Sequence, residues 1–285
     1  MVDTLVHDPP VASVAASEPQ VRRRRRSARP GGEPSALQLR VIGCASVGVA
    51  LALWELAARR GWMNARFTSY PTAIAKALRR EAASGALWEH SWASFQLFGW
   101  GLLLSVATAI PLGVVLGWYK RVNAAMDPFV SVVFAIPRLA LIPLVLLWFG
   151  IGFQARLVVV LLSAFFPLLL NTTAGVRSVD RQLLRVARSF QGSDLQIFKT
   201  LALPSAVPYI TTGLRQAIGQ ALIGVVAAEF FVGSQGLGAM ITKASILFRT
   251  DVAMAGVTVV AIFALVVTAL VRRLEQVVLK WYPKD

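Results

Sequence analysis

The sequence predicts an all-α integral membrane protein with about six transmembrane helices, and three observations support this fold class. First, 56% of the 285 residues are hydrophobic and the mean hydropathy is +0.63, above the usual range of a soluble domain. Second, the apolar residues form runs near the roughly 20 residues that cross a hydrocarbon core about 30 Å thick. Third, several runs carry almost no charge and have no polar face, which argues against a soluble helical bundle. The six runs cover about 40–58, 94–118, 128–150, 157–176, 207–232 and 252–272.

The chain begins with a basic tail, residues 1–39, which we expect to be disordered because it lacks apolar periodicity. Its run RRRRRS at 22–27 precedes the first apolar run, as in a secretory signal, but no small-residue cleavage site follows. We therefore expect an uncleaved first helix, a cytoplasmic N-terminus, and arginines that contact anionic headgroups of the membrane lipid. Residues 40–285 then form one transmembrane domain. The single cysteine, Cys44, lies in the first run and is expected to pack there.

The net charge is +15, and the basic residues lie at the ends of the runs and in loops. This placement favours the positive-inside rule over nucleic-acid binding. Six spans that start from a cytoplasmic N-terminus put the loop 118–128, the segment 177–206 and the C-terminus inside the cell. The outer loop 59–93 carries basic residues too, and it opposes this orientation in part. Within it, YPTAIAKALRREAASG predicts a short interfacial helix, with Pro71 near its start and Gly85 beyond its end.

Two prolines and an arginine interrupt the third run. Pro137 and Pro143 remove backbone hydrogen bonds, and broken helices of this kind occur where they line a cavity or pack in protein. Arg138 is a candidate pathway residue because charges inside spans usually serve function. The simpler interpretation, which we favour, is that the prolines shape packing and that Arg138 snorkels to the inner headgroups.

The fifth run contains two charged residues. Glu229 lies near its outer end, where the carboxylate either faces outer water or bonds polar groups near an outer gate. Arg215 stands fourteen residues earlier, about 21 Å away along a helix, so the two cannot pair within one chain.

The segment RQLLRVARSFQGSDLQIFKTLALP, residues 181–204, is charged and amphipathic although it separates two apolar runs. The apolar residues of a first helix share one face at helical spacing: Leu183, Val186, Ala187 and Phe190. A sharp turn at QGS follows, and Ser193 with Gln196 forms a capping-box pattern that begins a second helix. The apolar residues of that helix are Leu195, Phe198 and Leu201. Pro204 limits it, because the residue before a proline avoids helical geometry.

A short helix outside the bilayer must bury its apolar face against something. One interpretation is that it packs on the membrane surface or on neighbouring span ends. The other is that it docks into a groove on a cytoplasmic partner. The residues alone leave both open.

The same segment resembles the cytoplasmic coupling loop of ABC importer permeases, with its E-A-A, Gly and I-x-L-P pattern. Arg185-Val186-Ala187 stands at E-A-A, with arginine in place of the acidic residue, and Leu201-Ala202-Leu203-Pro204 matches I-x-L-P. Gln191 stands at the glycine, and Gly192 follows one place late. Further stretches at 134–152, 203–221 and 228–241 resemble the branch that imports aliphatic sulfonates, taurine and nitrate. The resemblance covers about 50–283.

This resemblance implies the permease subunit of an ATP-driven importer in the bacterial inner membrane, multi-pass, with both termini cytoplasmic. It implies a permease homodimer, a cytoplasmic ATP-binding subunit that holds ATP and Mg²⁺, and a periplasmic or extracellular solute-binding protein. The residues it assigns to ATPase coupling are Leu183, Arg185, Val186, Ala187, Phe190, Gly192, Leu201, Leu203 and Pro204. The candidate pathway or gate residues are Pro137, Arg138, Pro143 and Glu229.

Enzyme, metal and cofactor signals are missing from the sequence. It has no G-x-x-x-x-G-K-[ST] loop, the spacing of GSQGLG at 233–238 does not fit a dinucleotide loop, and His7 and His90 are far apart. Two rival classes remain. An ion-driven secondary transporter would carry paired carboxylates at mid-membrane, and a membrane anchor or assembly protein would need no docking loop.

Overall fold

The computed structural model describes residues 36–278, which include every helix that the sequence predicts. The predicted basic tail lies outside the described residues except for its last four, which begin the first helix, α1 (Ala36–Arg59). The remaining helices are α2 (Ala65–Thr68), α3 (Pro71–Ala83), α4 (Ala86–Trp118), α5 (Lys120–Ala135), η1 (Arg138–Leu141), α6 (Ile142–Phe149), α7 (Phe153–Arg177), α8 (Arg181–Ser189), α9 (Asp194–Ile197), η2 (Phe198–Ala202), α10 (Leu203–Val232), α11 (Leu237–Ile246) and α12 (Thr250–Val278). This confirms the all-α fold class.

The chain divides into two units, residues 1–48 and 49–285. The described part of the first unit is the first half of α1. From Val41 to Gly48 every residue of it is exposed, and the apolar side chains among them suit contact with lipid acyl chains.

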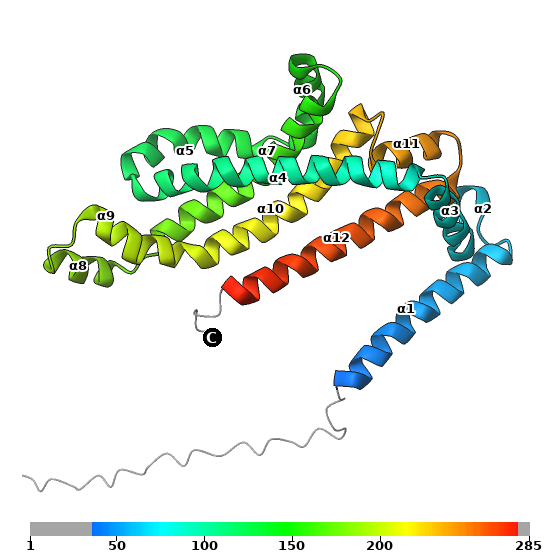
Figure 1. Cartoon of the computed structure of the whole chain (residues 1–285), viewed down its shortest axis with the longest axis horizontal. Helices are drawn as coiled ribbons and strands as arrows, with labels where there is room; N and C mark the ends of the chain where they lie inside the picture. The colour runs from blue at the N-terminus through cyan, green and yellow to red at the C-terminus, as the bar shows by residue number, and fades with distance from the viewer. Residues whose placement is uncertain (1–35, 279–285) are drawn as a thin grey trace, which may run out of the picture. The chain divides into compact units, whose positions relative to one another are not determined.

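In the second unit, α4 and α10 both pack against α7, and the three helices lie side by side in Figure 1. Their contacts bury Leu97, Val160, Leu168, Ala217 and Ala221. Small residues allow the close approach: a Cβ added at Gly213 would lie 2.7 Å from the Cβ of Asn171, and one at Gly224 would lie 2.8 Å from Ser163 Oγ. Close packing through small residues is typical of helices that associate in a bilayer.

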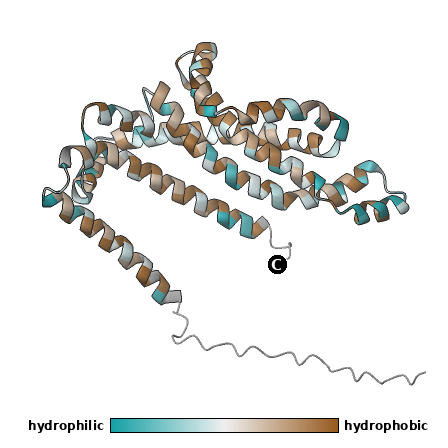
Figure 2. Cartoon of the chain, turned by 180° about the vertical axis from the view of Figure 1, so that it is seen from behind, coloured by the Kyte–Doolittle hydropathy of each residue, from teal (hydrophilic) through white to brown (hydrophobic). Residues whose placement is uncertain are grey.

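Five described helical stretches are long and apolar enough to cross a membrane: Val41–Arg59, Ala86–Trp118, Phe153–Arg177, Asp194–Val232 and Thr250–Val277. Figure 2 colours the hydrophobic residues of these helices brown. Five of the six predicted runs are thereby confirmed. The third differs, because it starts at Lys120 and is split into two parts, Lys120–Ala135 and Arg138–Phe149, that meet at 88°.

The two prolines of the third run have different effects. Ile136 adopts an extended conformation, with ψ 129°, because it precedes Pro137, and α5 therefore stops there. Pro143 falls in the first turn of α6, where its missing N–H has no partner to lose. Pro137 thus breaks the run, whereas Pro143 does not remove a hydrogen bond as the sequence suggested.

The predicted interfacial helix is α3, which has Pro71 in its first turn. Its N-terminus is held by Glu55 of α1, whose carboxylate accepts from Thr72 N at 3.0 Å and from Thr72 Oγ1 at 2.7 Å. The inner face of α3 packs with α11 and α12 through Ile74 and Ala77. Figure 1 shows α3 and α11 at the end of this unit opposite to α8 and α9.

Candidate functional site

The helix α8 begins at a side-chain cap and packs one face against the long helices. Asp180 begins it, since its Oδ1 accepts from Gln182 N at 2.7 Å. Leu184 packs against the cluster formed by Val176, Val179, Ala202 and Ala206, and Ala187 is half-buried on the same side. The sequence placed Ala187 with Leu183, Val186 and Phe190, but the structure turns it toward the protein.

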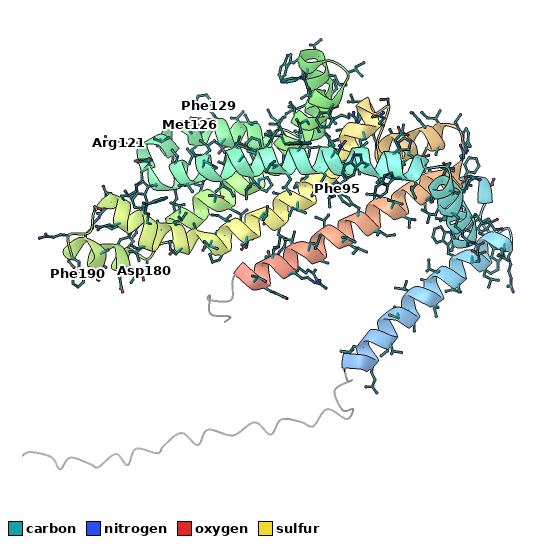
Figure 3. All side chains as sticks on the ribbon, in the orientation of Figure 1. Phe95, Arg121, Met126, Phe129, Asp180 and Phe190 are labelled. Atoms are coloured by element: carbon teal, nitrogen blue, oxygen red, sulfur yellow. The ribbon has the colours of Figure 1, made fainter. Side chains whose placement is uncertain are left out.

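Four apolar side chains of α8, of the residue that follows it and of α9 remain open to solvent. We call them the apolar ridge: Leu183 is 52% exposed, Val186 52%, Phe190 82% and Leu195 61%. Figure 3 labels Phe190 at the far end of α8, away from the long helices. No other described element covers these side chains, so the ridge is a surface that can be buried by a partner.

The turn after α8 explains the displaced glycine of the motif. Gln191, which stands at the glycine of the family pattern, adopts a left-handed φ of 56°. Gly192 N donates to Ala187 O at 3.1 Å, and Gln191 N donates to Arg188 O at 2.9 Å, a common way for a helix to end in a left-handed residue. Gly192 has another reason to lack a side chain, because a Cβ there would lie 3.0 Å from Ala187 O.

The second half of the segment begins as predicted but does not end as predicted. Ser193 Oγ accepts from Gln196 N and Gln196 Oε1 accepts from Ser193 N, so the capping box is present. The helix then continues through the π-helical turn η2 into α10, and Asp194–Val232 forms one span. Pro204 does not limit it. Leu203 stays helical, and its N–H bonds Phe198 O across the wider turn, which accommodates the proline that lacks an N–H.

The apolar residues of this second half do not share one environment. Phe198 is half-buried and packs edge-on against Trp118, with ring centroids 5.2 Å apart. Leu201 packs on the same cluster as Leu184, Leu203 is 40% exposed, and Leu195 belongs to the ridge.

Arg138 lies at the break between α5 and α6. Its Nη1 donates to Gln220 Oε1 of α10 at 3.1 Å, and its guanidinium lies 5.3 Å from the centre of the Phe134 ring. Gln220 is seventeen residues after the start of α10 and twelve before its end, about 26 Å and 18 Å along the helix. Arg138 therefore points to the middle part of α10.

A second polar pair follows Gln220 one turn nearer to the start of α10. Asn171 Nδ2 of α7 donates to Gln216 Oε1 at 3.1 Å. We call Arg138, Asn171, Gln216 and Gln220 the polar stripe. Gln216 is exposed and the other three are half-buried, so the stripe is open on one side.

Glu229 is fully buried, which excludes the interpretation that it faces outer water. Its Oε1 accepts from Ser94 Oγ at 2.7 Å and its Oε2 accepts from Gly238 N at 2.8 Å. Ser94 Oγ in turn accepts from Leu237 N at 2.8 Å. The carboxylate therefore fixes the turn between α10 and α11 to α4 through bonds to polar groups. Nothing in the sequence pattern pointed to Ser94.

Sequence reasoning also missed the partner of Arg215. The guanidinium forms a bidentate salt bridge with the carboxylate of Glu275 on α12, with Nε 2.9 Å from Oε1 and Nη2 bonded to Oε2. No spacing signal links two residues that are 60 positions apart. Among the described residues, no group of three or more His, Cys, Asp or Glu side chains could hold a metal ion.

Comparisons with known proteins place this geometry in a family. Residues 109–281 match the family described as binding-protein-dependent transport system inner membrane component. The putative aliphatic sulfonates transport permease protein SsuC of Bacillus subtilis (strain 168) is 33% identical over 233 residues, which cover 82% of this chain and 84% of that protein. The taurine transport system permease protein TauC of Escherichia coli (strain K12) is 31% identical over 246 residues, which cover 85% and 90%.

A solved structure supports the fold. A chain of the MetNI methionine ABC transporter, in an inward-facing form, matches with a TM-score of 0.55 at 18% identity, over 66% of this chain and 93% of that one. Family membership decides against the secondary transporter and the membrane anchor. It also implies a separate ATPase, a solute-binding protein and no cofactor in the permease itself. The chain belongs to the binding-protein-dependent transport system inner membrane components and is the multi-pass permease subunit of an ABC importer.

Proposed function

We propose that this permease imports a small solute, with an aliphatic sulfonate as the first candidate and the similar solutes nitrate and taurine as alternatives. The observation that carries the proposal is Arg138, a cation beside the middle of α10 that forms no ion pair with an acidic side chain among the described residues. The relatives SsuC and TauC, whose names specify aliphatic sulfonates and taurine, support the same class of solute.

A guanidinium inside a membrane span costs free energy unless a charged or polar group pairs with it. The neutral amide oxygen of Gln220 accepts from one of the five N–H donors of Arg138, and the Phe134 ring weakly attracts the cation. The remaining donors suit the oxygens of a sulfonate, which accept hydrogen bonds and carry negative charge. An anion passing along the stripe would therefore be attracted at the point where the bilayer opposes it most.

The polar stripe is open on one side, so a single copy does not enclose a pathway. We propose that two copies pair about a two-fold axis and close the stripes over a shared pathway. Pro137 belongs to this site because it creates the break that brings Arg138 to Gln220. Pro143 and Glu229 support it from outside the stripe, the first by starting α6 and the second by fixing the turn before α11.

We further propose that the segment 177–206 faces the cytoplasm and docks on the ATPase, with both termini on the same side. The apolar ridge supports docking through Leu183, Val186 and Phe190. Arg185 lies on the opposite face of α8 from Phe190, so it is not placed to contact the same groove. The tail 1–39 and the transmembrane domain 40–285 remain the proposed division of the chain.

Transport by purified complexes in vesicles, with the ATPase and the binding protein present, tests the solute class. Arg138→Gln should lower ATP-driven uptake of an alkanesulfonate at least tenfold, while Arg138→Lys should retain more of it because the charge remains. Gln220→Leu serves as the matched control for loss of the neutral hydrogen-bond partner and should have the smaller effect. Uptake by Arg138→Gln at the wild-type rate would refute the role of the cation, and uptake driven by an ion gradient without ATP would refute the importer mechanism.

A further inference from the structure

A second cavity lies beside α8, away from the polar stripe. It has a volume of about 1010 Å³ and lies between α8 and the junction of α4 with α5. Five of the side chains that line it are cationic: Lys120, Arg177, Arg181, Arg185 and Arg188. Asp194 is the one acidic side chain in the lining. We call this cavity the basic pocket.

The sequence periodicity of α8 creates the pocket. Arg181, Arg185 and Arg188 are spaced by four and three residues, so they lie on one face of the helix. That face is opposite to Leu183, Val186 and Phe190 of the apolar ridge, because residues five and nine positions apart on a helix point in opposite directions. A partner can therefore cover the ridge while the pocket stays open.

The cations of the pocket are largely without counter-charges. Arg181, Arg185, Arg188 and Lys120 form no ion pair or side-chain hydrogen bond with any other residue that the structure describes. Arg177 donates to the backbone, with Nη2 at 3.0 Å from Leu116 O. Like charges that converge on one cavity repel each other, so an anion that enters it gains from several of them at once.

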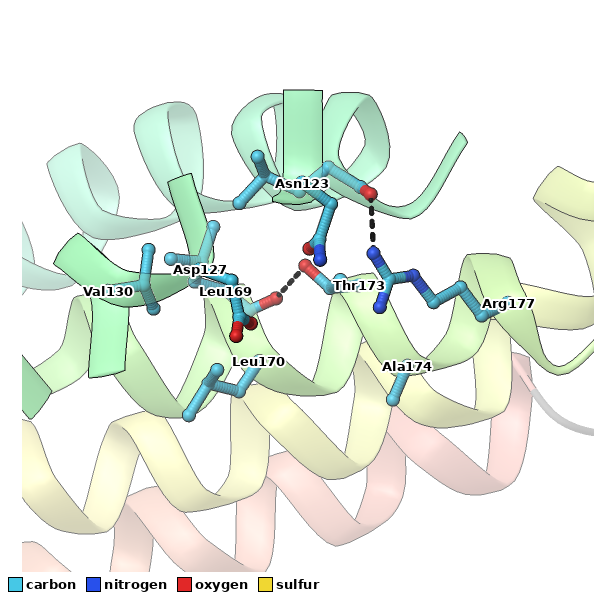
Figure 4. Close-up of a pocket in the computed structure, with 9 residues that line it drawn as sticks. Asn123, Asp127, Val130, Leu169, Leu170, Thr173, Ala174 and Arg177 are labelled. Carbon is cyan, nitrogen blue, oxygen red and sulfur yellow. Dashed lines mark hydrogen bonds between the residues drawn. The ribbon is translucent and has the colours of Figure 1, made fainter. Parts of the chain in front are cut away.

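A smaller cavity of about 300 Å³ adjoins the pocket and shares Asn123 and Arg177 with it. Figure 4 shows Asn123 and Asp127 of α5 facing Thr173 and Arg177 of α7, with the Arg177 side chain reaching toward α4. Asn123 adds a neutral amide between the two cavities. Polar atoms thus continue from the pocket toward the core of the helices.

The pocket lies at the ends of spans, where lipid headgroups are found. α4 ends at Trp118 and α7 ends at Arg177. Trp118 and Tyr119 line the pocket, and aromatic residues of this type gather at the interface between membrane and water. Basic pockets between spanning helices at this level suit the headgroups of acidic lipids.

We propose that the basic pocket binds the headgroup of an acidic phospholipid that carries two phosphates. Arg181 and Arg188 are seven residues apart, about 10.5 Å along α8, so the row of arginines is long enough to offer separate cations to each of two linked phosphates. Two linked phosphates can occupy the two ends of this row, with Lys120 and Arg185 between them as further donors. The bound lipid fixes the orientation of α8 from the side that the apolar ridge leaves free. This site is separate from the proposed solute pathway and from the proposed ATPase contact.

The test uses the full permease in neutral phosphatidylcholine vesicles, with a small fraction of a labelled lipid. The diphosphate lipid diphosphatidylglycerol should co-purify with the protein, and at equal total charge the monophosphate lipid phosphatidylglycerol should bind at least tenfold more weakly. Sodium pyrophosphate should not displace the lipid at equal phosphate concentration. Equal binding of the two lipids would show only surface charge, and displacement by pyrophosphate would show a site for free phosphate; either result overturns the proposal.

Variants localise the site. The triple change Arg181→Gln, Arg185→Gln and Arg188→Gln should lower retention of the diphosphate lipid at least tenfold. The matched control is Arg272→Gln with Arg273→Gln, two exposed arginines of α12 that do not line the pocket, and it should retain the lipid. Wild-type retention by the triple variant, or loss of the lipid when the ATPase is added, would also refute the proposal. The lipid comparison on the unmodified protein stays decisive if the triple variant does not fold.

Discussion

Phe190→Ala tests the docking function of α8 most directly. Phe190 follows the last residue of α8 and is 82% exposed, more than any other side chain of the apolar ridge. It makes no ring contact with another aromatic side chain among the described residues. The change therefore removes surface that a partner can cover, and it leaves the packing of Leu184 on the spans untouched.

The size of the effect follows from the exposed area. A phenylalanine buries roughly 200 Å² when fully covered, so about 160 Å² of Phe190 is available to a partner. At about 25 cal/mol per Å², complete burial is worth about 4 kcal/mol, and burial of half the area about 2 kcal/mol. Aromatic anchors of interfaces commonly lose 2 kcal/mol or more on truncation. A loss of about 2 kcal/mol weakens binding roughly thirtyfold.

The assay is co-purification of the ATPase with tagged permease, followed by ATP-driven uptake in vesicles. Phe190→Ala should reach the membrane at wild-type levels but lose the ATPase on purification. Phe231→Ala is the matched control, because Phe231 is 65% exposed at the other end of α10, far along the chain from the ridge. Wild-type ATPase retention and transport by Phe190→Ala would refute the docking hypothesis.

Three further predictions address the turn, the buried carboxylate and the orientation. Gln191→Gly should slow amide hydrogen exchange in α8 a few-fold, because it relieves about 1 kcal/mol of left-handed strain; faster exchange would contradict this. Glu229→Gln should lower the Tm in detergent, because it removes an acceptor from a buried network and costs about 1–3 kcal/mol; an unchanged Tm would count against that role. In a cysteine-free background, Ser84→Cys should react with an impermeant thiol reagent outside intact cells and Ser193→Cys should not; the opposite pattern reverses the orientation.

Features that depend on composition or on near neighbours could be predicted from the sequence. The spans α7 and α12 have high mean hydropathies of 2.1 and 2.6, which a helix that crosses a bilayer requires. The capping box of Ser193 joins residues three positions apart, so its pattern is local. The exposure of Phe190 also follows from local spacing once a short helix is expected at that place.

Features that depend on distant contacts could not be predicted. Glu229 bonds Ser94 across 135 positions, and Arg215 meets Glu275 across 60, with no periodicity to link either pair. The prolines of the third run were visible in the sequence. The 88° bend and the hydrogen bond from Arg138 to Gln220, however, depend on how α10 packs beside that run. The sequence therefore gave no sign that Arg138 bonds Gln220. A local rule also failed at Pro204, where the π-helical turn absorbs the missing hydrogen bond.

The helix Asp194–Val232 is continuous, so it connects the apolar ridge to the polar stripe without an intervening loop. The capping box fixes the start of α9, the π-helical turn maintains hydrogen bonding into α10, and the same helix then carries Gln216 and Gln220 of the polar stripe. A displacement of α9 by a docked partner would therefore reach the stripe through backbone hydrogen bonds. The two variants separate the ends of this path: Phe190→Ala should lose the ATPase, whereas Arg138→Gln should keep it and lose transport. If Arg138→Gln also released the ATPase, the stripe and the ridge would not be independent sites joined by α10.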